Sequence, residues 1–363
     1  MSKEKKKKNP FLKVLKVILI LILIVVLLFA GLLVFLSVTE YKPADEETIT
    51  VVGTADKEVP TGETVKIVSW NVGYCALGDN ADFFMDGGKM VNTASKERVE
   101  ENLDAVISFI KSEKPSLILL QETDVSSDRS HRINEADSIR DAFDGFSSTF
   151  AYNFKVAFHP YPIPPMGKIA SGVMTLAEYK VESAERIQLP IPFKWPVSML
   201  NLKRCLNVNR IPVEGGDKHL VLINLHLEAY DDGEGKIMQT AALKEFLEKE
   251  YAEGNYVIAG GDFNQIFSSE DADLFKAQEG KWAPGVIDVS TFEDGWQFLM
   301  DERTPSCRSL DQPLIGADLD NFQYYLIDGF IVSENVKVSN LETKDLGFIN
   351  SDHNPVVMEF TLD

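Results

Sequence analysis

The chain begins with a lysine-rich segment and then changes abruptly to an unbroken apolar run. Every residue from position 17 to position 36 is apolar or glycine. Twenty helical residues rise about 30 Å, which is the thickness of the hydrocarbon core of a bilayer. Because the run has no polar face, it does not match a helix on the surface of a globular domain. The pattern therefore predicts a transmembrane helix, and we assign the anchor to residues 17–38.

Charge is distributed unequally on the two sides of this run. Residues 1–16 contain seven lysines, whereas the residues that follow the run are mostly acidic and polar. The positive-inside rule therefore predicts a cytoplasmic tail over residues 1–16, a single pass through the cell membrane and an extracytoplasmic domain. A cleaved signal peptide is the alternative, but the apolar core is long for one and no small-residue cleavage site follows it.

The remainder of the chain divides into a short polar segment and one long domain. Residues 39–63 are rich in Thr, Glu, Asp, Pro and Gly, which predicts a solvated linker. Residues 64–363 alternate β-branched runs with amphipathic runs, which favours an α/β domain whose buried sheets are faced by helices. Strands are predicted at 65–70, 116–121, 220–227, 256–259, 324–332 and 356–362, and helices at 95–114 and 237–251. The proline- and aromatic-rich stretch 152–195 is predicted to be irregular surface around strands, forming one wall of a cleft.

Composition narrows the class of partner. After position 39 the chain contains 29 Lys and Arg against 55 Asp and Glu. So acidic a body repels polyanions, which disfavours a dedicated nucleic-acid-binding protein. Cys75, Cys205 and Cys307 match no zinc-site spacing. We expect buried thiols, and one disulfide remains open for an extracytoplasmic domain.

Polar side chains repeatedly follow the ends of the predicted strands, where ligands bind in α/β sheets. They are carboxylates, amides and two histidines, and they include no Ser or Cys in a recognisable nucleophile elbow. This set suits a hard cation bound by oxygen ligands, and it suits activation of water by a general base. The candidates are Asn71, Glu122, His226, Asp262, Asn264, Asp328, Asp352 and His353.

The order of these motifs resembles a known family. The motifs are Trp70-Asn71, Gln121-Glu122, NLHL at 224–227, GGDFN at 260–264, Ile327-Asp328 and SDHNP at 351–355. Together they resemble the endonuclease/exonuclease/phosphatase superfamily, which includes deoxyribonuclease-like and neutral sphingomyelinase-like enzymes. The resemblance covers residues 64–363. It implies a four-layer α/β sandwich, in which two packed mixed β-sheets are flanked by helices.

The resemblance also implies roles for the matching residues. Asn71 and Glu122 are similar to the family's Mg²⁺ site, with Mn²⁺ as an alternative ion. His226 is similar to a phosphate-oxygen donor. Asp262 and Asn264 are similar to the pair that positions the attacking water and the phosphate. His353 is similar to the catalytic imidazole, which Asp328 or Asp352 would orient.

The sequence departs from the family pattern at two places. Val72 and Gly73 follow Asn71, where some relatives have an Asp that assists the metal. Val173 follows Gly172, where the family often has an Asn. Asn153, Arg204 and Arg210 are candidate substitutes for that amide, although each is equally compatible with an ordinary surface or turn residue.

Three functions follow as hypotheses. The first is metal-dependent hydrolysis of a phosphodiester or phosphomonoester by water, with a lipid or small-molecule substrate near the membrane. The second is an extracellular nuclease, which the acidic body disfavours. The third is a non-catalytic binding module on the same fold, since a fold does not determine a function. The sequence predicts neither the substrate nor the oligomeric state.

Overall fold

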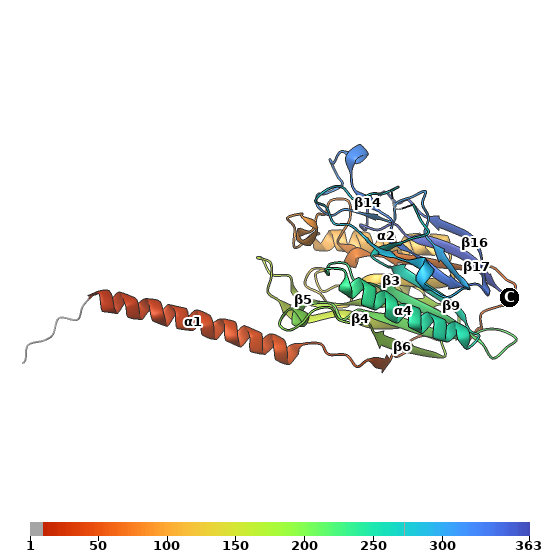
Figure 1. Cartoon of the computed structure of the whole chain (residues 1–363), viewed down its shortest axis with the longest axis horizontal. Helices are drawn as coiled ribbons and strands as arrows, with labels where there is room; N and C mark the ends of the chain where they lie inside the picture. The colour runs from red at the N-terminus through yellow and green to blue at the C-terminus, as the bar shows by residue number, and fades with distance from the viewer. Residues whose placement is uncertain (1–9, 272) are drawn as a thin grey trace, which may run out of the picture.

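The computed structural model describes residues 10–271 and 273–363, which form a long helix and a rounded body. Helix α1 (Pro10–Thr39) projects away from the body along most of its length (Figure 1). In the described part of the chain it is the helix that is long and apolar enough to cross a membrane. Its apolar side chains are exposed as far as residue 31, as expected of a helix that meets lipid rather than protein, and Leu32 and Leu33 are half-buried.

Two large sheets form the centre of the body. Within the described residues, one has the strand order β1-β6-β7-β8-β9-β15-β12 and the other β16-β17-β2-β3-β5-β4. Both are mixed, because β2 and β3 are parallel, β8 and β9 are parallel, and their other neighbours are antiparallel. The strands of the first sheet are β1 (Glu46–Thr48), β6 (Ser183–Gln188), β7 (Cys205–Pro212), β8 (His219–His226), β9 (Tyr256–Asp262), β12 (Trp296–Leu299) and β15 (Asp328–Ser333). Those of the second are β2 (Val65–Asn71), β3 (Leu117–Asp124), β4 (Ser147–His159), β5 (Gly167–Ala177), β16 (Val336–Thr343) and β17 (Val356–Leu362).

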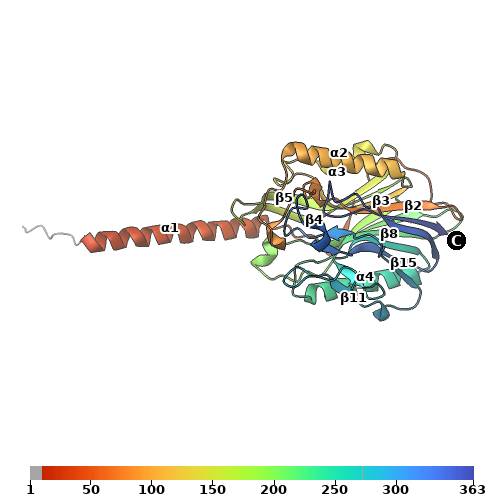
Figure 2. The same ribbon diagram turned by 90° about the horizontal axis from the view of Figure 1, so that it is seen from above.

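Helices cover the outer faces of the two sheets (Figure 2). The second sheet is covered by α2 (Lys96–Glu113) and α3 (Glu135–Ala142), and the first by α4 (Glu234–Ala252). Helix α2 begins at Ser95, whose side chain accepts a hydrogen bond from the Arg98 amide, and it ends at left-handed Lys114 before a proline. Short strands and 3-10 turns complete the body: β10 (Gln265–Phe267), β11 (Gly285–Ile287), β13 (Cys307–Arg308), β14 (Tyr324–Tyr325), η1 (Gly73–Cys75), η2 (Phe84–Asp86), η3 (Val197–Leu200), η4 (Val289–Thr291) and η5 (Leu319–Asn321).

Three hydrophobic layers hold these elements together. Between the sheets, side chains such as Leu119, Phe330 and Met358 pack in one cluster. A second cluster lies under α2 and a third under α4, where Leu243 and Leu247 are fully buried. These layers confirm the predicted four-layer α/β sandwich preceded by one apolar helix.

Two local predictions are wrong. Stretch 152–195 is not mainly irregular, because it contributes the end of β4 and all of β5 and β6. Its prolines lie in the loops after β4 and β6, where a missing amide breaks no ladder hydrogen bond. The predicted strand 324–332 is divided into β14 and β15.

The segment after α1 is more ordered than a solvated linker. Strand β1 pairs with β6 at the edge of the first sheet, Val52 bridges Ser148, and Val59 is fully buried. The polar side chains of this segment indicated contact with solvent, but its backbone adds a strand and two bridges to the sheets. Most side chains of residues 39–63 are nevertheless exposed or half-buried, so the segment is attached to the body mainly through its backbone, and the boundaries of the linker stay a prediction.

Candidate active site

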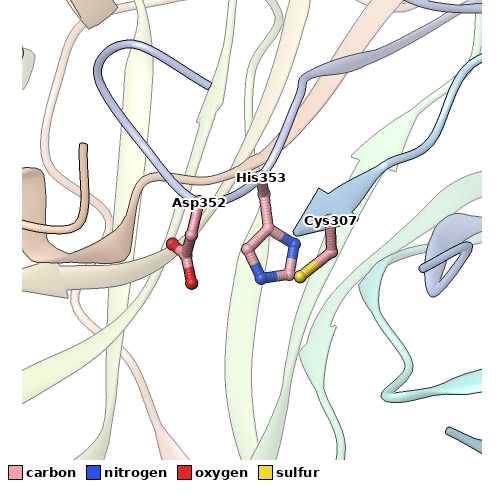
Figure 3. Close-up of side chains that lie close together, drawn as sticks. All are labelled: Cys307, Asp352 and His353. Carbon is pink, nitrogen blue, oxygen red and sulfur yellow. The ribbon is translucent and has the colours of Figure 1, made fainter. Parts of the chain in front are cut away.

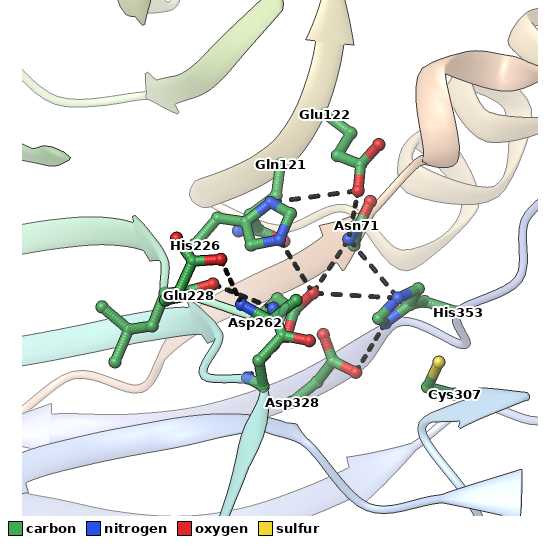
Figure 4. Close-up of polar contacts among 12 residues, drawn as sticks. Asn71, Gln121, Glu122, His226, Glu228, Asp262, Cys307, Asp328 and His353 are labelled. Atoms are coloured by element: carbon green, nitrogen blue, oxygen red, sulfur yellow. Dashed lines mark hydrogen bonds and ion pairs between the residues drawn. The ribbon is translucent and has the colours of Figure 1, made fainter. Parts of the chain in front are cut away.

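Strand pairing brings the predicted site residues to one rim of the sandwich (Figure 4). Asn71 ends β2, Glu122 lies near the end of its parallel neighbour β3, and His226 lies opposite Asp262 across β8 and β9. Asp328 lies opposite Asp262 from the other side. Because the two sheets pack face to face, the four strand ends converge on the same point from two sides.

Asn71 lies at the centre of this group. Its Nδ2 donates to Asp262 Oδ2 at 3.0 Å and to Glu122 Oε1 at 3.4 Å, and it lies 3.4 Å from His353 Nε2. Its Oδ1 accepts a hydrogen bond from the Gly73 amide at 3.1 Å. Asn71 therefore joins the two sheets through its amide nitrogen and holds the turn after β2 through its oxygen.

Glu122 reaches the pocket through an unusual backbone conformation. Its φ is +54°, in the left-handed region, and it lies where the register between β3 and β5 shifts. Such a bulge interrupts the alternation of side chains and directs one of them away from its expected face. The carboxylate keeps 25% of its exposure although both neighbours are fully buried. It is therefore the carboxylate of this rim that is best placed to meet an ion from solvent.

His353 is held on both sides. Its Nδ1 donates to Asp328 Oδ2 at 2.8 Å, and its carbonyl accepts from Trp70 Nε1 at 2.8 Å. Burial alone lowers the pKa of His353, but the Asp328 carboxylate raises it, and the net pKa lies well above the usual value. The contact with Asp328 therefore favours the imidazolium form of the ring. Of the two predicted orienting groups, Asp328 is the one that binds Nδ1.

His226 has the opposite electrostatic character. Burial lowers its pKa well below the usual value, and the positive charges of Arg204 and His353 add to this shift. Its Nε2 lies 3.4 Å from Asp262 Oδ2, and its Nδ1 lies 4.0 Å from Glu122 Oε1. Among the described residues Nδ1 has no hydrogen-bond partner although it is buried. The site thus combines two imidazoles whose pKa values are shifted in opposite directions, a division typical of acid–base sites.

Two carboxylates of the rim are difficult to ionise. Burial, with the neighbouring Asp328 carboxylate, raises the pKa of Asp262 to about 7. Burial raises the pKa of Asp352 to about 6, against the opposing effect of His353. Asn264, with φ +51°, donates its amide to Asp262 Oδ1 at 2.8 Å and its Nδ2 to the Leu227 carbonyl. The rim therefore has more carboxylates than positive charges, and a bound divalent ion would offset that negative charge.

The oxygen-rich donor set fits a hard cation. Two groups of side chains have metal-ligand spacing among the described residues: Cys307, Asp352 and His353 (Figure 3), and Asp262, Asp328 and His353. Burial raises the pKa of the Cys307 thiol to about 12, so it is protonated at neutral pH and is a poor ligand. In both groups His353 already binds Asp328 through Nδ1. Glu122, partly exposed and 4.0 Å from His226, is more accessible than the carboxylates of either group.

The rim opens into a pocket of about 450 Å³. Its walls include several residues that the sequence analysis did not single out. Buried Arg129 binds Asp124 with two nitrogens and stacks over the ring of Tyr74 at 3.6 Å. An isolated Arg followed by polar residues gave no recognisable signal in the sequence. Other lining residues that the sequence did not indicate include Tyr74, Asp86, Glu228, Tyr230, Trp282 and Tyr325.

The three candidate substitutes for the missing family amide occupy different places. Asn153 and Arg204 both line the pocket. Arg204 Nη1 donates to the His226 carbonyl at 3.1 Å, and its Nε lies 3.4 Å from Glu228 Oε2. Arg210 instead binds Glu250 at the other end of β7, with two contacts of 2.7 Å. Arg210 is therefore separate from the site.

Comparison with known proteins agrees with this architecture. Residues 68–338 match the model of the endonuclease/exonuclease/phosphatase family. The chain belongs to this family. Its members are metal-dependent phosphoesterases or nucleases, so the family supports hydrolysis of phosphoester bonds without naming a substrate. No curated protein sequence is significantly similar to the chain.

Solved structures of family members share the fold at low sequence identity. An endonuclease/exonuclease/phosphatase from Beutenbergia cavernae is 16% identical with a TM-score of 0.53, and the match covers 82% of this chain and 72% of that one. A family protein from Bacteroides thetaiotaomicron is 13% identical with a TM-score of 0.52, over 83% and 98% of the two chains. The catalytic domain of human Nocturnin is 15% identical with a TM-score of 0.51, over 87% and 98%.

Proposed function

We propose that this protein is a membrane-anchored, divalent-cation-dependent phosphoesterase that uses water to hydrolyse a phosphodiester or phosphomonoester. One observation carries the proposal: two imidazole rings, whose pKa values are shifted in opposite directions, lie 3.4 and 3.8 Å from the same buried carboxylate oxygen, Asp262 Oδ2, at the base of an open pocket. Such a group can accept a proton from water and offset negative charge on phosphate without a covalent intermediate. A lipid or another small phosphoester is the favoured substrate class.

In this proposal Glu122 holds Mg²⁺, with Mn²⁺ as the alternative ion. Asn71 becomes a ligand of the cation after its side-chain amide rotates, because its Oδ1 accepts a hydrogen bond from the Gly73 amide in this structure. The cation would polarise a phosphate oxygen and offset charge that develops in the transition state. Glu122 is the residue whose loss should remove this contribution.

The other side chains have complementary roles. Asp262, close to both histidines, holds the attacking water in line and receives its proton. His353 donates to a phosphate oxygen from Nε2, because Asp328 occupies Nδ1. His226 is a neutral donor to a second oxygen, and Asn264 steadies Asp262 through its amide. Asp352, on the pocket wall, adds negative charge that favours cation binding.

We also propose that α1 spans the cell membrane with the N-terminus in the cytoplasm and the catalytic body outside. The seven lysines before residue 17 support this orientation. Protease treatment of sealed cells provides the check. The body should be digested from outside and the N-terminal segment should be protected.

The central experiment uses the full chain in detergent or in lipid vesicles with Mg²⁺. Phospholipid, plasmid DNA and an inositol phosphate are compared as substrates, for the wild type and for Glu122→Ala. Chelator-sensitive turnover of one substrate that is lost in Glu122→Ala supports the proposal and selects the substrate class. Turnover of DNA alone favours the nuclease. A folded protein that turns over none of them and gains no thermal stability from Mg²⁺ contradicts the proposal and favours a binding module.

A further inference from the structure

Exposed apolar side chains gather where α1 joins the body. We define the apolar rim as Met85, Phe158, Tyr161, Ile163, Trp195 and Val197, whose exposed fractions range from 37% to 93%. They come from the η2 turn, from the β4–β5 hairpin, and from η3 and the loop that leads into it. The hairpin loop projects on the side from which α1 leaves the body, and both views agree on this (Figures 1 and 2). Monomeric proteins rarely leave such a patch uncovered.

The segments of the apolar rim touch one another and α1. The rings of Phe84 and Tyr161 lie 5.8 Å apart, which joins the η2 turn to the hairpin. Helix α1 contacts both β4 and η3. The three segments of the apolar rim are thus linked to one another, and two of them lie beside the base of the helix.

The length of α1 indicates where the apolar rim lies relative to the hydrocarbon core of the bilayer. Counted from residue 17, a rise of about 30 Å ends at Leu36, and Leu36 is also the first residue of α1 that the body buries. The next residue, Ser37, accepts a hydrogen bond from Trp195 Nε1 at 3.3 Å and donates to Met199 Sδ at 3.1 Å. Trp195 therefore lies at the level where a hydrocarbon core would end, which is where tryptophan is enriched in membrane proteins.

The junction between α1 and the body is fixed by contacts that follow the helix directly. Lys203 Nζ lies 3.1 Å from Glu40 Oε1, and both side chains are at most 10% exposed. Strand β1 then enters the sheet at Glu46. A buried ion pair is costly to break, so the body is held at one angle to α1 rather than swinging on a tether.

The charge of the same region differs from that of the rest of the body. Residues 145–177 and 187–213, which include the hairpin and the loop before η3, contain no Asp or Glu, whereas the chain as a whole has 56. They contain six Lys and Arg, among them Lys155, Lys168 and Lys194. Lys203, Arg204 and Arg210 are paired with Glu40, Glu228 and Glu250. The basic side chains that suit the charge of a phospholipid headgroup layer are therefore Lys155, Lys168 and Lys194.

The active-site pocket opens at the apolar rim. Met85 and Tyr161 belong to the rim and also line the pocket, and Leu200 and Asn201, which follow Val197 along the chain, line it as well. A molecule held in the headgroup layer would therefore meet the pocket mouth directly.

We propose that the apolar rim docks into the bilayer interface beside α1, and that the substrate is a membrane lipid whose phosphoester enters the pocket from the bilayer. This inference rests on the proposed phosphoesterase function and on the proposed membrane span. The occupant of the rim is the lipid leaflet, not a second protein. The catalytic site then acts on lipid without extracting it fully into water.

The first test measures contact with lipid and does not depend on activity. The full chain is reconstituted in vesicles of phosphatidylcholine and phosphatidylglycerol, with nitroxide quenchers placed near the headgroup. The fluorescence of Trp195 is obtained as the difference between the wild type and Trp195→Phe, since the chain has three other tryptophans. Strong quenching of this difference signal is expected. An unquenched signal in protein that is correctly inserted overturns the docking.

The second test separates docking from catalysis with a matched control. Val197 and Val52 are exposed to similar extents, but Val52 bridges Ser148 at the start of β4, the end opposite the hairpin. Ile163→Ser and Val197→Ser should each lower hydrolysis of vesicle phospholipid, measured as release of water-soluble phosphorus, about tenfold. Both should leave hydrolysis of bis-para-nitrophenyl phosphate unchanged, and Val52→Ser should affect neither reaction. Circular dichroism verifies folding. Ile163 is the most exposed residue of the apolar rim, so its replacement by serine should not disturb the fold.

The outcomes distinguish this inference from the proposed function. No turnover of either substrate, with Trp195 still quenched, rejects the phosphoesterase and retains the docking surface. Turnover of the soluble diester but of no vesicle lipid rejects the lipid substrate. Equal losses in Val52→Ser and Val197→Ser, or cross-linking of two chains through the apolar rim in vesicles, overturn the docking proposal.

Discussion

The two ends of the first sheet show how differently the same fold treats its charged residues. At the end far from the pocket, Glu250 accepts two 2.7 Å contacts from Arg210 and a third from Asn255 at 3.0 Å. Burial raises the pKa of Glu250, but these hydrogen bonds outweigh it and lower the pKa below the usual value. At the pocket end the contacts to Asp262 from the two histidines are 3.4 and 3.8 Å, and its pKa is raised to about 7.

The comparison distinguishes ionisable side chains that stabilise the fold from those whose missing partner would be a ligand. A buried carboxylate costs free energy unless it is paired. Glu250 is paired completely, so its role is structural. The carboxylates of the pocket are paired incompletely, so the fold tolerates a local cost that a cation and a phosphate would remove. The following predictions test this distinction, from the largest expected effect to the smallest.

Glu122→Ala should lower kcat/KM by about 10³-fold or more, because a bound cation supplies several kcal/mol of transition-state stabilisation. Thermal unfolding should show a normal Tm without Mg²⁺ and no rise in Tm when Mg²⁺ is added, unlike the wild type. A variant that keeps the Mg²⁺-dependent rise in Tm would place the cation elsewhere in the pocket.

His353→Ala should lower kcat/KM by about 10²- to 10³-fold, the range for loss of an acid–base group. Asp328→Asn keeps the contact to Nδ1 but removes the charge that raises the pKa of His353, so a loss of about tenfold is expected. Steady-state kinetics with circular dichroism measure both. Near-normal turnover in folded His353→Ala would refute its catalytic role.

The wild-type pH profile should show an acid limb. Asp262 receives the proton of water only as a carboxylate, and its pKa is raised to about 7, so kcat/KM should rise about tenfold per pH unit between pH 5 and the apparent pKa. A bound cation moves that apparent pKa downward, so higher Mg²⁺ should shift the limb to lower pH. A flat profile over this range would remove Asp262 from the proton transfer.

Arg210→Met should leave kcat/KM unchanged but lower the free energy of unfolding by about 2 kcal/mol, because it leaves Glu250 buried with one partner fewer. The pKa of Glu250 is lowered in the folded state, so its contribution is present above pH of about 4 and is lost as the pH falls through the folded pKa. Urea unfolding at pH 7 and at pH 3 should therefore show a smaller difference between variant and wild type at pH 3.

Cys307→Ser should have the smallest effect, a change in kcat/KM of less than about threefold. The thiol next to His353 is protonated at neutral pH because burial raises its pKa, so a hydroxyl can replace it. Activity titrated with Mg²⁺ provides the measurement. A large rise in the Mg²⁺ concentration needed for activity would indicate that Cys307, Asp352 and His353 form the metal site.

The sequence predicted most of the fold and the convergence of the candidate residues on one rim, because both depend on local patterns. Apolar runs followed by Asn71, Glu122 or Asp262 identify strand ends, and parallel strand ends meet at one rim. What the sequence did not predict depends on register between distant strands. The left-handed bulge at Glu122, the stacking of Arg129 on Tyr74 and the separation of Arg204 from Arg210 all follow from which residues face each other across the sheets.

Strand β1 has a practical consequence for any shortened form of the protein. It covers β6, which would otherwise be the free edge of the first sheet. Exposed edge strands pair with other chains and promote aggregation. A soluble fragment that begins at residue 64, where the strand pattern of the sequence starts, would remove this cover and also lose the buried Val59. A fragment that begins just before Glu46 keeps both, so the solubility of the two fragments should differ although neither contains α1.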